Sequence, residues 1–413
     1  MKRIASLSGL EILDSRGHPT VKCLCILNDG VEASASVPSG ASTGRAEAIE
    51  LRDGDPRRFG GLGCLKAVSH VNGLLAEELQ GKSFDSQEVL DNRLIELDGT
   101  LDKSRLGSNS LLAVSMAYAR CASLSEGKPL HLYFSEMLDV NPKMPRLTVN
   151  LFSGGKHAGD QVAIQDVLLV PCQASVSDSL AAVFTVYQTA ARVIMQRHGM
   201  PALSADEGGL APPFTGSEAM LEEACYSIQA AGLELGGEME LALDAAASHF
   251  YAKGRYDLDG KSLSSTEMIV TLKNWSARFP LISIEDGLHE EDWEHWPMLK
   301  QELGEACLTL GDDLLCTSSK RIRRATSIKA CNALLLKLNQ IGTLSEGAEA
   351  YRIARDAGWK VVVSARSGET EDDWLADLAY GWGADYIKVG SITQSERLAK
   401  YNRLIEIEAS VES

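Results

Sequence analysis

The chain has 413 residues, with 40 lysines and arginines against 57 aspartates and glutamates, so its formal net charge is −17. This length is too great for one small core and predicts about two domains, or one barrel with an appended domain. A hydrophobic share of 45% and a charged share of 23% exclude a disordered or fibrous chain. The acidic balance argues against nucleic acid as a partner, because a negative surface repels a phosphate backbone.

The nine cysteines are scattered and form no C-x-x-C pair, which favours buried thiols over a zinc site or a disulfide framework. A basic start is one feature of a signal peptide, but Glu11, Asp14 and Arg16 interrupt any apolar segment behind it. No run approaches the roughly eighteen apolar residues of a membrane span. We therefore expect a cytoplasmic protein with no membrane partner.

The first elements expected along the chain are two strands, at residues 20–27 and 31–37. They flank Asn28-Asp29-Gly30, which is typical of a hairpin because these residues tolerate positive φ. Residues 38–44 are small and polar, and they predict either a plain connector or a mobile loop that binds a ligand.

Helices are expected next, over residues 64–80, 86–97 and 108–126. Pro142 and Pro145 then break the pattern. We therefore expect an N-terminal α+β domain over residues 1–138 and a second domain over residues 139–413.

From about residue 146, short apolar runs alternate with longer amphipathic stretches. The runs cover residues 163–170, 241–243, 281–284, 307–310, 333–336, 360–363 and 384–387. The polar residues that close the last six runs are Asp244, Glu285, Asp312, Lys337, Ser364 and Lys388. These residues follow one another at 24 to 41 positions, close to the length of one strand-helix unit. Repeated units of this kind predict a parallel sheet, closed as a barrel or left open.

These closing residues indicate a metal site, because the carboxyl ends of barrel strands meet where active sites form. Asp244, Glu285 and Asp312 would repel one another there without a divalent cation. An all-oxygen ligand set favours magnesium or manganese over zinc. Lys337 and Lys388 beside a cation are expected to have lowered pKa values, so that one of them can act as a base.

Two further residues indicate an anion-binding site. Arg366 offers a planar fork suited to phosphate or carboxylate, with the hydroxyl of Ser367 beside it. We call Arg366 and Ser367 together the anion grip. A metal, a lysine base and this anion grip predict abstraction of a proton next to a carboxylate. The second negative charge that builds up is stabilised by cations aimed at it.

Nine segments in the same order resemble the enolase family of phosphopyruvate hydratases. They are Glu11–Thr20, Val37–Gly44, Gly154–Gly159, Asp206–Gly209, Ser283–Asp286, Gly311–Leu314, Ala333–Gly342, Arg366–Asp372 and Ser395–Asn402. The resemblance covers almost the whole chain. It implies an α/β fold in which a smaller N-terminal α+β domain caps a variant TIM-type αβ barrel. It also implies homodimers or larger assemblies built from dimers.

The resemblance further implies two magnesium ions per active site. Asp244, Glu285 and Asp312 would hold the tightly bound ion, and Ser39 would help to hold the second, which arrives with the substrate. Lys337 would take the α-proton of 2-phospho-D-glycerate, a step of glycolysis, while the substrate carboxylate would face Lys388.

The same comparison implies residues for the phosphate and for the leaving group. Arg366 and Ser367 would grip the phosphate. Glu207, with Asp166 as its partner, would assist departure of the hydroxide, so that water is eliminated to give phosphoenolpyruvate. Two further positions match substrate-contacting residues of the family, His157 and Gln165.

The chain departs from the family pattern inside this site. Ala365 replaces a histidine, and Asp166 stands where a glutamate is usual. A carboxylate shortened by about one bond length is misplaced enough to cost about 10²-fold in rate. Smaller changes are Ser153, Lys156 and Gly287.

Three functions therefore stay open. The first is a dehydratase of 2-phospho-D-glycerate, a carbon-oxygen lyase, which the retained carboxylates, lysines and arginine favour. The second is a family enzyme for a related phospho- or phosphono-carboxylate, such as the enolase-like synthases of carboxyphosphonoenolpyruvate in phosphonate antibiotic biosynthesis, because a fold does not determine its substrate. The third is a non-catalytic binding protein.

Overall fold

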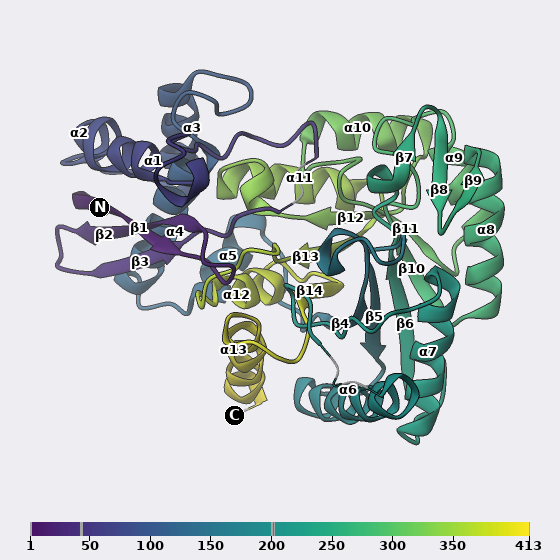
Figure 1. Ribbon diagram of the computed structural model, residues 1–413. Helices are drawn as coiled ribbons and strands as arrows, with labels where there is room; N and C mark the ends of the chain where they lie inside the picture. The colour runs from purple at the N-terminus through teal and green to yellow at the C-terminus, as the bar shows by residue number, and fades with distance from the viewer. Residues whose placement is uncertain (1, 42–43, 200, 202, 413) are drawn as a thin grey trace.

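The computed structural model describes residues 2–41, 44–199, 201 and 203–412. An N-terminal part built around a three-stranded sheet lies beside a closed eight-stranded barrel, as Figure 1 shows in purple and in teal to yellow. Among the helices of the described chain, none is both long enough and apolar enough to cross a membrane.

The N-terminal sheet is antiparallel, with β2 (Pro19–Leu27) between β1 (Ile4–Leu13) and β3 (Glu32–Ser36). The predicted hairpin is confirmed, and Gly30 in its turn has the positive φ of 87° that a side chain disfavours. The sequence did not predict β1. Its exposed Leu10 and Leu13 obscure the alternation of apolar and polar residues that is typical of a half-buried strand.

The helices of this part cover one face of the sheet, and the long α4 packs against β2 and β3. Their bounds are η1 (Phe59–Gly61), α1 (Leu65–His70), η2 (Val71–Leu75), α2 (Ala76–Leu79), α3 (Gln87–Asp98), α4 (Ser108–Ser125) and α5 (Leu130–Leu138). The single helix expected over residues 64–80 is instead divided by the wider π-helical turn η2. The helices expected over residues 86–97 and 108–126 are confirmed within a residue or two.

The barrel closes in the order β4-β5-β6-β10-β11-β12-β13-β14. Its strands are β4 (Arg146–Ser153), β5 (Asp166–Pro171), β6 (Met239–Asp244), β10 (Leu281–Glu285), β11 (Leu308–Gly311), β12 (Ala333–Leu336), β13 (Lys360–Ser364) and β14 (Tyr386–Gly390). The expectation of a parallel sheet is wrong for β5, which runs antiparallel to both β4 and β6. Residues 154–165 are too few for the helical crossover that a parallel return needs, so the chain turns back directly.

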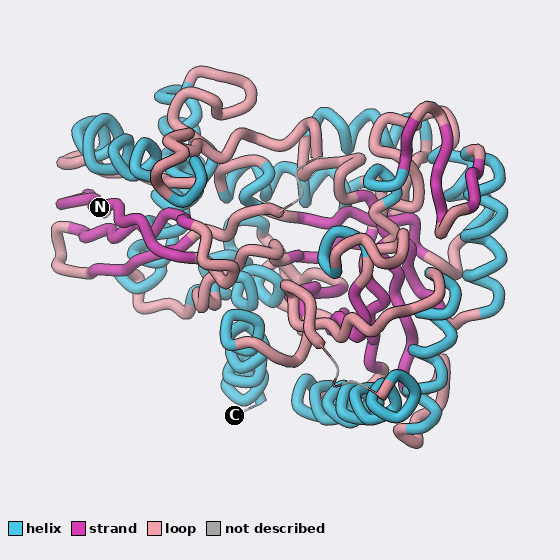
Figure 2. Tube along the Cα trace, in the orientation of Figure 1, coloured by secondary structure: helices cyan, strands magenta, loops and turns pink. Residues whose placement is uncertain are grey.

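Helices surround the barrel strands, as Figure 2 shows in cyan around magenta. They are α6 (Val176–His198), α7 (Ser217–Ala230), α8 (Ser265–Arg278), α9 (Trp296–Leu303), α10 (Ser319–Ile328), α11 (Leu344–Asp356), α12 (Trp374–Gly381) and α13 (Ser395–Glu412). The loops at the barrel mouth add short pieces: η3 (Gly155–Ala158), η4 (Ala247–Phe250), η5 (Leu338–Gln340) and a small sheet of β7 (Tyr251–Ala252), β8 (Arg255–Leu258) and β9 (Lys261–Leu263).

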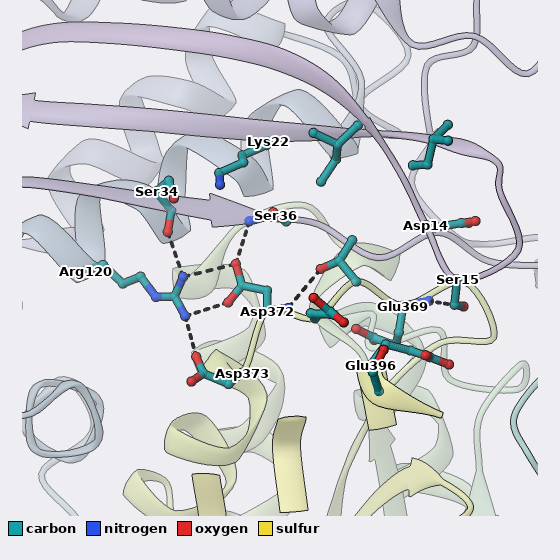
Figure 3. A pocket seen from close by; sticks show the side chains of 15 residues that line it. Asp14, Ser15, Lys22, Ser34, Ser36, Arg120, Glu369, Asp372, Asp373 and Glu396 are labelled. Atoms are coloured by element: carbon teal, nitrogen blue, oxygen red, sulfur yellow. Dashed lines mark hydrogen bonds and ion pairs between the residues drawn. The ribbon is translucent and has the colours of Figure 1, made fainter. Parts of the chain in front are cut away.

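An arginine joins the N-terminal part to the barrel, at a cavity of about 670 Å³ between them (Figure 3). Arg120 of α4 donates to Asp372 at 2.5 and 3.0 Å and to Asp373 at 2.8 Å. The backbone N–H of Ser36, at the end of β3, donates to the same Asp372 carboxylate at 2.7 Å. These bonds hold the end of the N-terminal sheet beside the loop after β13, so Ser39 of the N-terminal part reaches the barrel mouth.

Candidate active site at the barrel mouth

Six of the predicted residues converge because of where their strands end. Asp244 and Glu285 are the last residues of β6 and β10 and lie side by side in the register of the two strands. Asp312 and Lys337 directly follow β11 and β12, while Lys388 lies in β14 opposite Ser364 of β13. These strands run parallel, so the polar residues at or just after their ends lie at the same end of the barrel.

Two lysines lie among the three carboxylates. Lys388 Nζ is 2.9 Å from an oxygen of Asp244 and 2.7 Å from an oxygen of Glu285. Lys337 Nζ pairs with Asp312. All five side chains are buried or nearly so. Each charge is therefore removed from water, which leaves these partners to stabilise it.

The electrostatic balance of this cluster is negative, with three carboxylates against two ammonium groups. Burial raises the pKa of Glu285 well above its ordinary range, Asp244 raises it further, and Lys388 opposes both. Burial lowers the pKa of Lys388, but the carboxylates of Asp244 and Glu285 outweigh it, so that this pKa is raised. The pKa of Lys337 is likewise raised, by Asp312 against burial. The carboxylates alone thus raise the pKa values of both lysines, and the lowered values expected beside a cation remain a prediction.

Magnesium fits this donor set. The carboxylates of Asp244, Glu285 and Asp312 offer only hard oxygen ligands, and a divalent cation would offset the surplus negative charge that raises the pKa of Glu285. Gln165 Nε2 and Gln340 Nε2 donate to Asp244 at 3.1 Å and to Asp312 at 2.9 Å, so both carboxylates are also oriented by neutral amides.

A second acidic group shares Asp312 with the first. Asp286, Asp312 and Asp313 each place a carboxylate oxygen within 4.8 Å of the others. The two oxygens of Asp286 accept the backbone N–H groups of Asp312 at 2.9 Å and Asp313 at 2.7 Å. Burial and then Asp312 raise the pKa of Asp313 to about 8. We assign Asp286 to fixing the turn that carries Asp312, because its oxygens are already engaged by that turn.

The anion grip is assembled from both parts of the chain. Arg366, which is 4% exposed, donates to both oxygens of Glu47 at 3.0 and 3.3 Å and to Asn339 Oδ1 at 3.0 Å. The hydroxyl of Ser367 accepts the backbone N–H of Ala41 at 3.0 Å. Burial lowers the pKa of Arg366, but Glu47 outweighs it and keeps the guanidinium charged.

The leaving-group side is built on the reversed strand. Because β5 is antiparallel, its first residue, Asp166, lies at the same barrel end as the last residues of the other strands, opposite Asp244. Asp166 is fully buried and accepts the hydroxyl of Ser153 at 2.5 Å. Glu207 is buried and accepts Nδ2 of Asn150 at 3.1 Å.

A cavity of about 30 Å³ at the centre of the mouth collects most of the predicted residues. It is lined by Ala41, Gln165, Glu207, Asp244, Asp312, Lys337, Ser364, Ala365, Arg366, Ser367 and Lys388. Glu285 and Asp166 are not part of this lining, but Glu285 contacts Lys388 and Asp166 contacts Ser153. The structure describes the backbone of His157, but its side chain lies outside the described part.

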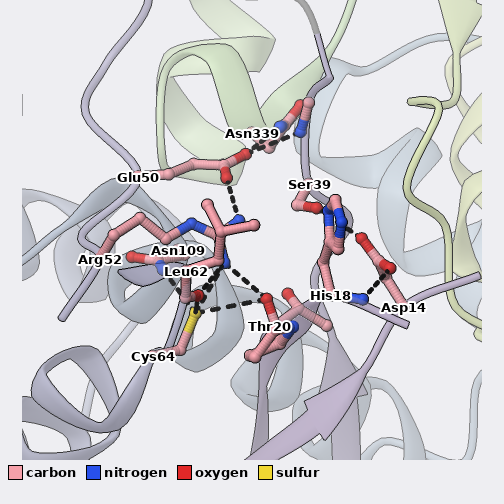
Figure 4. A network of polar contacts seen from close by, with 12 residues as sticks. Asp14, His18, Thr20, Ser39, Glu50, Arg52, Leu62, Cys64, Asn109 and Asn339 are labelled. Atoms are coloured by element: carbon pink, nitrogen blue, oxygen red, sulfur yellow. Dashed lines mark hydrogen bonds and ion pairs between the residues drawn. The ribbon is translucent and has the colours of Figure 1, made fainter. Parts of the chain in front are cut away.

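Ser39 does not line this cavity but lies against Gly368, in the loop that carries Ser367. Its backbone exchanges two hydrogen bonds with Gly368, at 2.7 and 3.0 Å, and its hydroxyl donates to Asp14 at 2.7 Å. Beyond Ser39, Glu50 accepts the N–H of Gly40 at 3.1 Å and Nδ2 of Asn339 at 3.2 Å, part of the network in Figure 4. The loop thus meets the barrel directly at Gly368 and, through Glu50, at Asn339.

Several residues of the site were not singled out from the sequence. Asn339, Gln340 and Arg397 lie within segments that resemble the family, and Arg16 does too, so their segments were noted but not their contacts. Arg397 is fully buried and donates to the carbonyl oxygens of Arg366 at 2.7 Å and Ser367 at 2.6 Å. No local pattern in the sequence pointed to Glu47, because its partner Arg366 is more than three hundred positions away.

The fold and the site define a two-domain α/β-barrel protein with carboxylates, lysines and an anion-binding arginine at the barrel mouth. The model for "Enolase, N-terminal domain" matches residues 4–134, and that for "Enolase, C-terminal TIM barrel domain" matches residues 141–413. The chain belongs to the enolase family. Its two domains are those of an enolase-superfamily lyase, a family that is generally magnesium-dependent.

Proposed function

We propose that this protein is a magnesium-dependent lyase that removes the α-proton of 2-phospho-D-glycerate and eliminates water to give phosphoenolpyruvate. The observation that carries the proposal is the cavity at the barrel mouth, where Lys337, Lys388 and Arg366 border one small space. A substrate with a carboxylate at one end and a phosphate nearby matches this arrangement of three cations.

Lys337 is the proposed base, acting at Nζ. An amine accepts a proton only when neutral, and against the effect of burial the charge of Asp312 raises the pKa of Lys337. The proposed role therefore requires the Asp312 carboxylate to be engaged elsewhere when the substrate is bound. Lys388 is proposed to face the substrate carboxylate, where its charge opposes the negative charge that develops as the α-proton leaves.

Asp244, Glu285 and Asp312 are proposed to hold one magnesium ion, and Ser39 to help hold a second. When bound, magnesium supplies positive charge that stabilises the carboxylate as it gains electron density. Arg366 and Ser367 are proposed to grip the phosphate. Glu207 is proposed to protonate the departing hydroxide, with Asp166 as its partner and with His157 and Gln165 as substrate contacts.

The second candidate function is that of a family enzyme acting on a related phospho- or phosphono-carboxylate. It is favoured by one observation: the side chain of Ala365 in the cavity is a methyl group, while Asp166 is tied to Ser153. These two positions therefore offer the substrate a different shape from the one that the family pattern implies. For either substrate we propose a small anionic acid as the ligand, and a homodimer as the assembly.

The test is turnover of 2-phospho-D-glycerate, followed by the absorbance of phosphoenolpyruvate, with magnesium and after chelation. We expect slow, magnesium-dependent turnover. Absence of turnover with 2-phospho-D-glycerate, together with turnover of a phosphonate analogue, would assign the second candidate instead.

A further inference from the structure

Arg16, from the turn between β1 and β2, reaches the two hydroxyl groups at the edge of the site. Its Nη1 donates to Ser367 Oγ at 3.2 Å and its Nη2 donates to Ser39 Oγ at 2.9 Å. The side chain is 11% exposed and pairs with Asp14 at 3.3 Å. One guanidinium thus contacts both the proposed phosphate serine and the proposed metal serine.

The contacts give these two hydroxyls opposite orientations. A serine hydroxyl has one hydrogen to donate and two lone pairs to accept with. Ser367 Oγ accepts from Arg16 and from the backbone N–H of Ala41, which uses both lone pairs and directs its hydrogen to a further acceptor. Ser39 Oγ donates its hydrogen to Asp14 at 2.7 Å and accepts from Arg16, which leaves it one lone pair. Ser367 is therefore set to donate to an anion, and Ser39 to accept from a donor or a cation.

The position of Arg16 is closely fitted to the loop after β13. A Cβ atom added to Gly368 would lie 2.5 Å from Arg16 Nη2, 2.3 Å from Asp14 Oδ2 and 2.7 Å from Ser39 Oγ. A side chain at position 368 would therefore displace these three groups from the loop that carries Ser367. Arg16 also lines an outer cavity of about 770 Å³, which shares Ala41 with the inner one. The guanidinium thus stands between the outer cavity and the anion grip.

We propose that Arg16 is a positioning residue that orients the Ser367 hydroxyl as a hydrogen-bond donor to the phosphate or phosphonate group of the substrate. This inference rests on the proposed function only in taking Ser367 as part of the anion grip. Lysine in place of Arg16 would keep the positive charge but lose the fork that reaches two hydroxyls at once.

The test is a double-mutant cycle with inorganic phosphate as the probe, titrated by calorimetry at a fixed saturating magnesium concentration. We expect Arg16→Lys and Ser367→Ala each to weaken phosphate binding about tenfold, as expected for loss of a hydrogen bond to a charged group. In the Ser367→Ala background, Arg16→Lys should add less than about twofold, because its effect passes through that hydroxyl. Thermal unfolding of each variant checks that the fold is retained.

The matched control is Arg52→Lys. Arg52 lines the same outer cavity but donates to the carbonyl oxygens of Pro19 and Leu62 and to Glu50, without touching either serine hydroxyl (Figure 4). This variant should bind phosphate like the wild type.

Three results would overturn the positioning role: no phosphate binding by the wild type, no loss in Arg16→Lys, or an equal loss in the presence and absence of the Ser367 hydroxyl. Turnover of 2-phospho-D-glycerate is measured separately. If turnover is absent while the phosphate cycle behaves as expected, the proposed reaction fails and the role of Arg16 stands.

Discussion

Two sets of residues at the barrel mouth are built in different ways, and although their strands alternate around the barrel we call them the charged side and the leaving-group side. On one side, Lys388 directly bridges Asp244 and Glu285, so each charge depends on the others. On the other side, Asp166 is tied to Ser153 in the neighbouring strand, and Ala365 contributes only a methyl group. A change on the first side leaves a buried charge without its direct partner, whereas on the second side Ala365 carries no charge and Asp166 acts on Lys388 less than Asp244 and Glu285 do. We therefore expect the reaction chemistry to be sensitive on the first side and the substrate preference to be adjustable on the second.

The largest effect is expected from Asp312→Ala on the charged side. The substitution removes a proposed metal ligand and the partner of Lys337, so turnover should fall by about 10³-fold or more. Chelation of the wild-type protein should have the same effect. Turnover and far-UV circular dichroism are measured together, with Glu349→Ala, an exposed carboxylate paired with Arg323, as the control. Full activity of the chelated wild type would show that the metal assignment is wrong.

Lys337→Ala should affect one step in particular. Without the proposed base, exchange of the substrate α-proton with solvent deuterium should slow by about 10²- to 10⁴-fold. The measurement is NMR of 2-phospho-D-glycerate incubated in deuterium oxide with magnesium. Exchange at the wild-type rate in this variant would move the role of the base to another residue.

The sequence predicted the charged side better than the leaving-group side, for a physical reason. Parallel strands repeat in one direction, so the residues that close successive apolar runs reach the same end of the barrel, as Asp244 and Lys337 do. Asp166 opens its strand instead of closing it, because β5 is reversed, and only the family resemblance pointed to it. Contacts between domains, such as that of Glu47 with Arg366, leave no local pattern in the sequence.

A smaller effect is expected from restoring the family residues on the leaving-group side, by Ala365→His together with Asp166→Glu. If the protein is a weakened enolase, these changes should raise turnover of 2-phospho-D-glycerate by up to about 10²-fold, since placement of the carboxylate is then the main loss. The hydroxyl of Ser153 donates to Asp166. A further variant therefore adds Ser153→Ala to the double substitution, so that the longer carboxylate is released from this hydrogen bond.

The opposite result would change the interpretation of this side. If the double substitution impairs turnover of a phosphonate analogue and leaves 2-phospho-D-glycerate a poor substrate, the site is adapted to a different acid. Ordinary enolase turnover by the wild type would instead show that both substitutions are tolerated. Each variant is assayed with both substrates, so that preference is measured as a ratio of kcat/KM values.

The smallest expected effect is on the stability of the folded protein. Its dependence on pH through Asp313 tests whether the charged side carries surplus negative charge. The pKa of Asp313 is about 8 in the folded protein, against an ordinary value of 3.8, because of burial and the charge of Asp312. Between these two values the folded protein keeps a proton that the unfolded chain has released. The contribution of Asp313 to stability is therefore fully present below about pH 4, falls as pH rises towards 8, and is constant above that.

Asp313→Asn removes this titration, so its stability relative to the wild type should increase from pH 5 to pH 8. We expect a gain of about 1 kcal/mol at pH 8, or about 1 °C in Tm for a chain of this length, measured by thermal unfolding in the presence of a chelator. The control Asp356→Asn, at the exposed end of α11, should show no such change with pH. Magnesium added to the wild type should reduce its loss of stability between pH 5 and pH 8, because a cation bound to Asp312 offsets the charge that raises the pKa of Asp313. A gain that does not change with pH would mean that Asp313 is ionised throughout this range, and that the surplus charge lies elsewhere in the cluster.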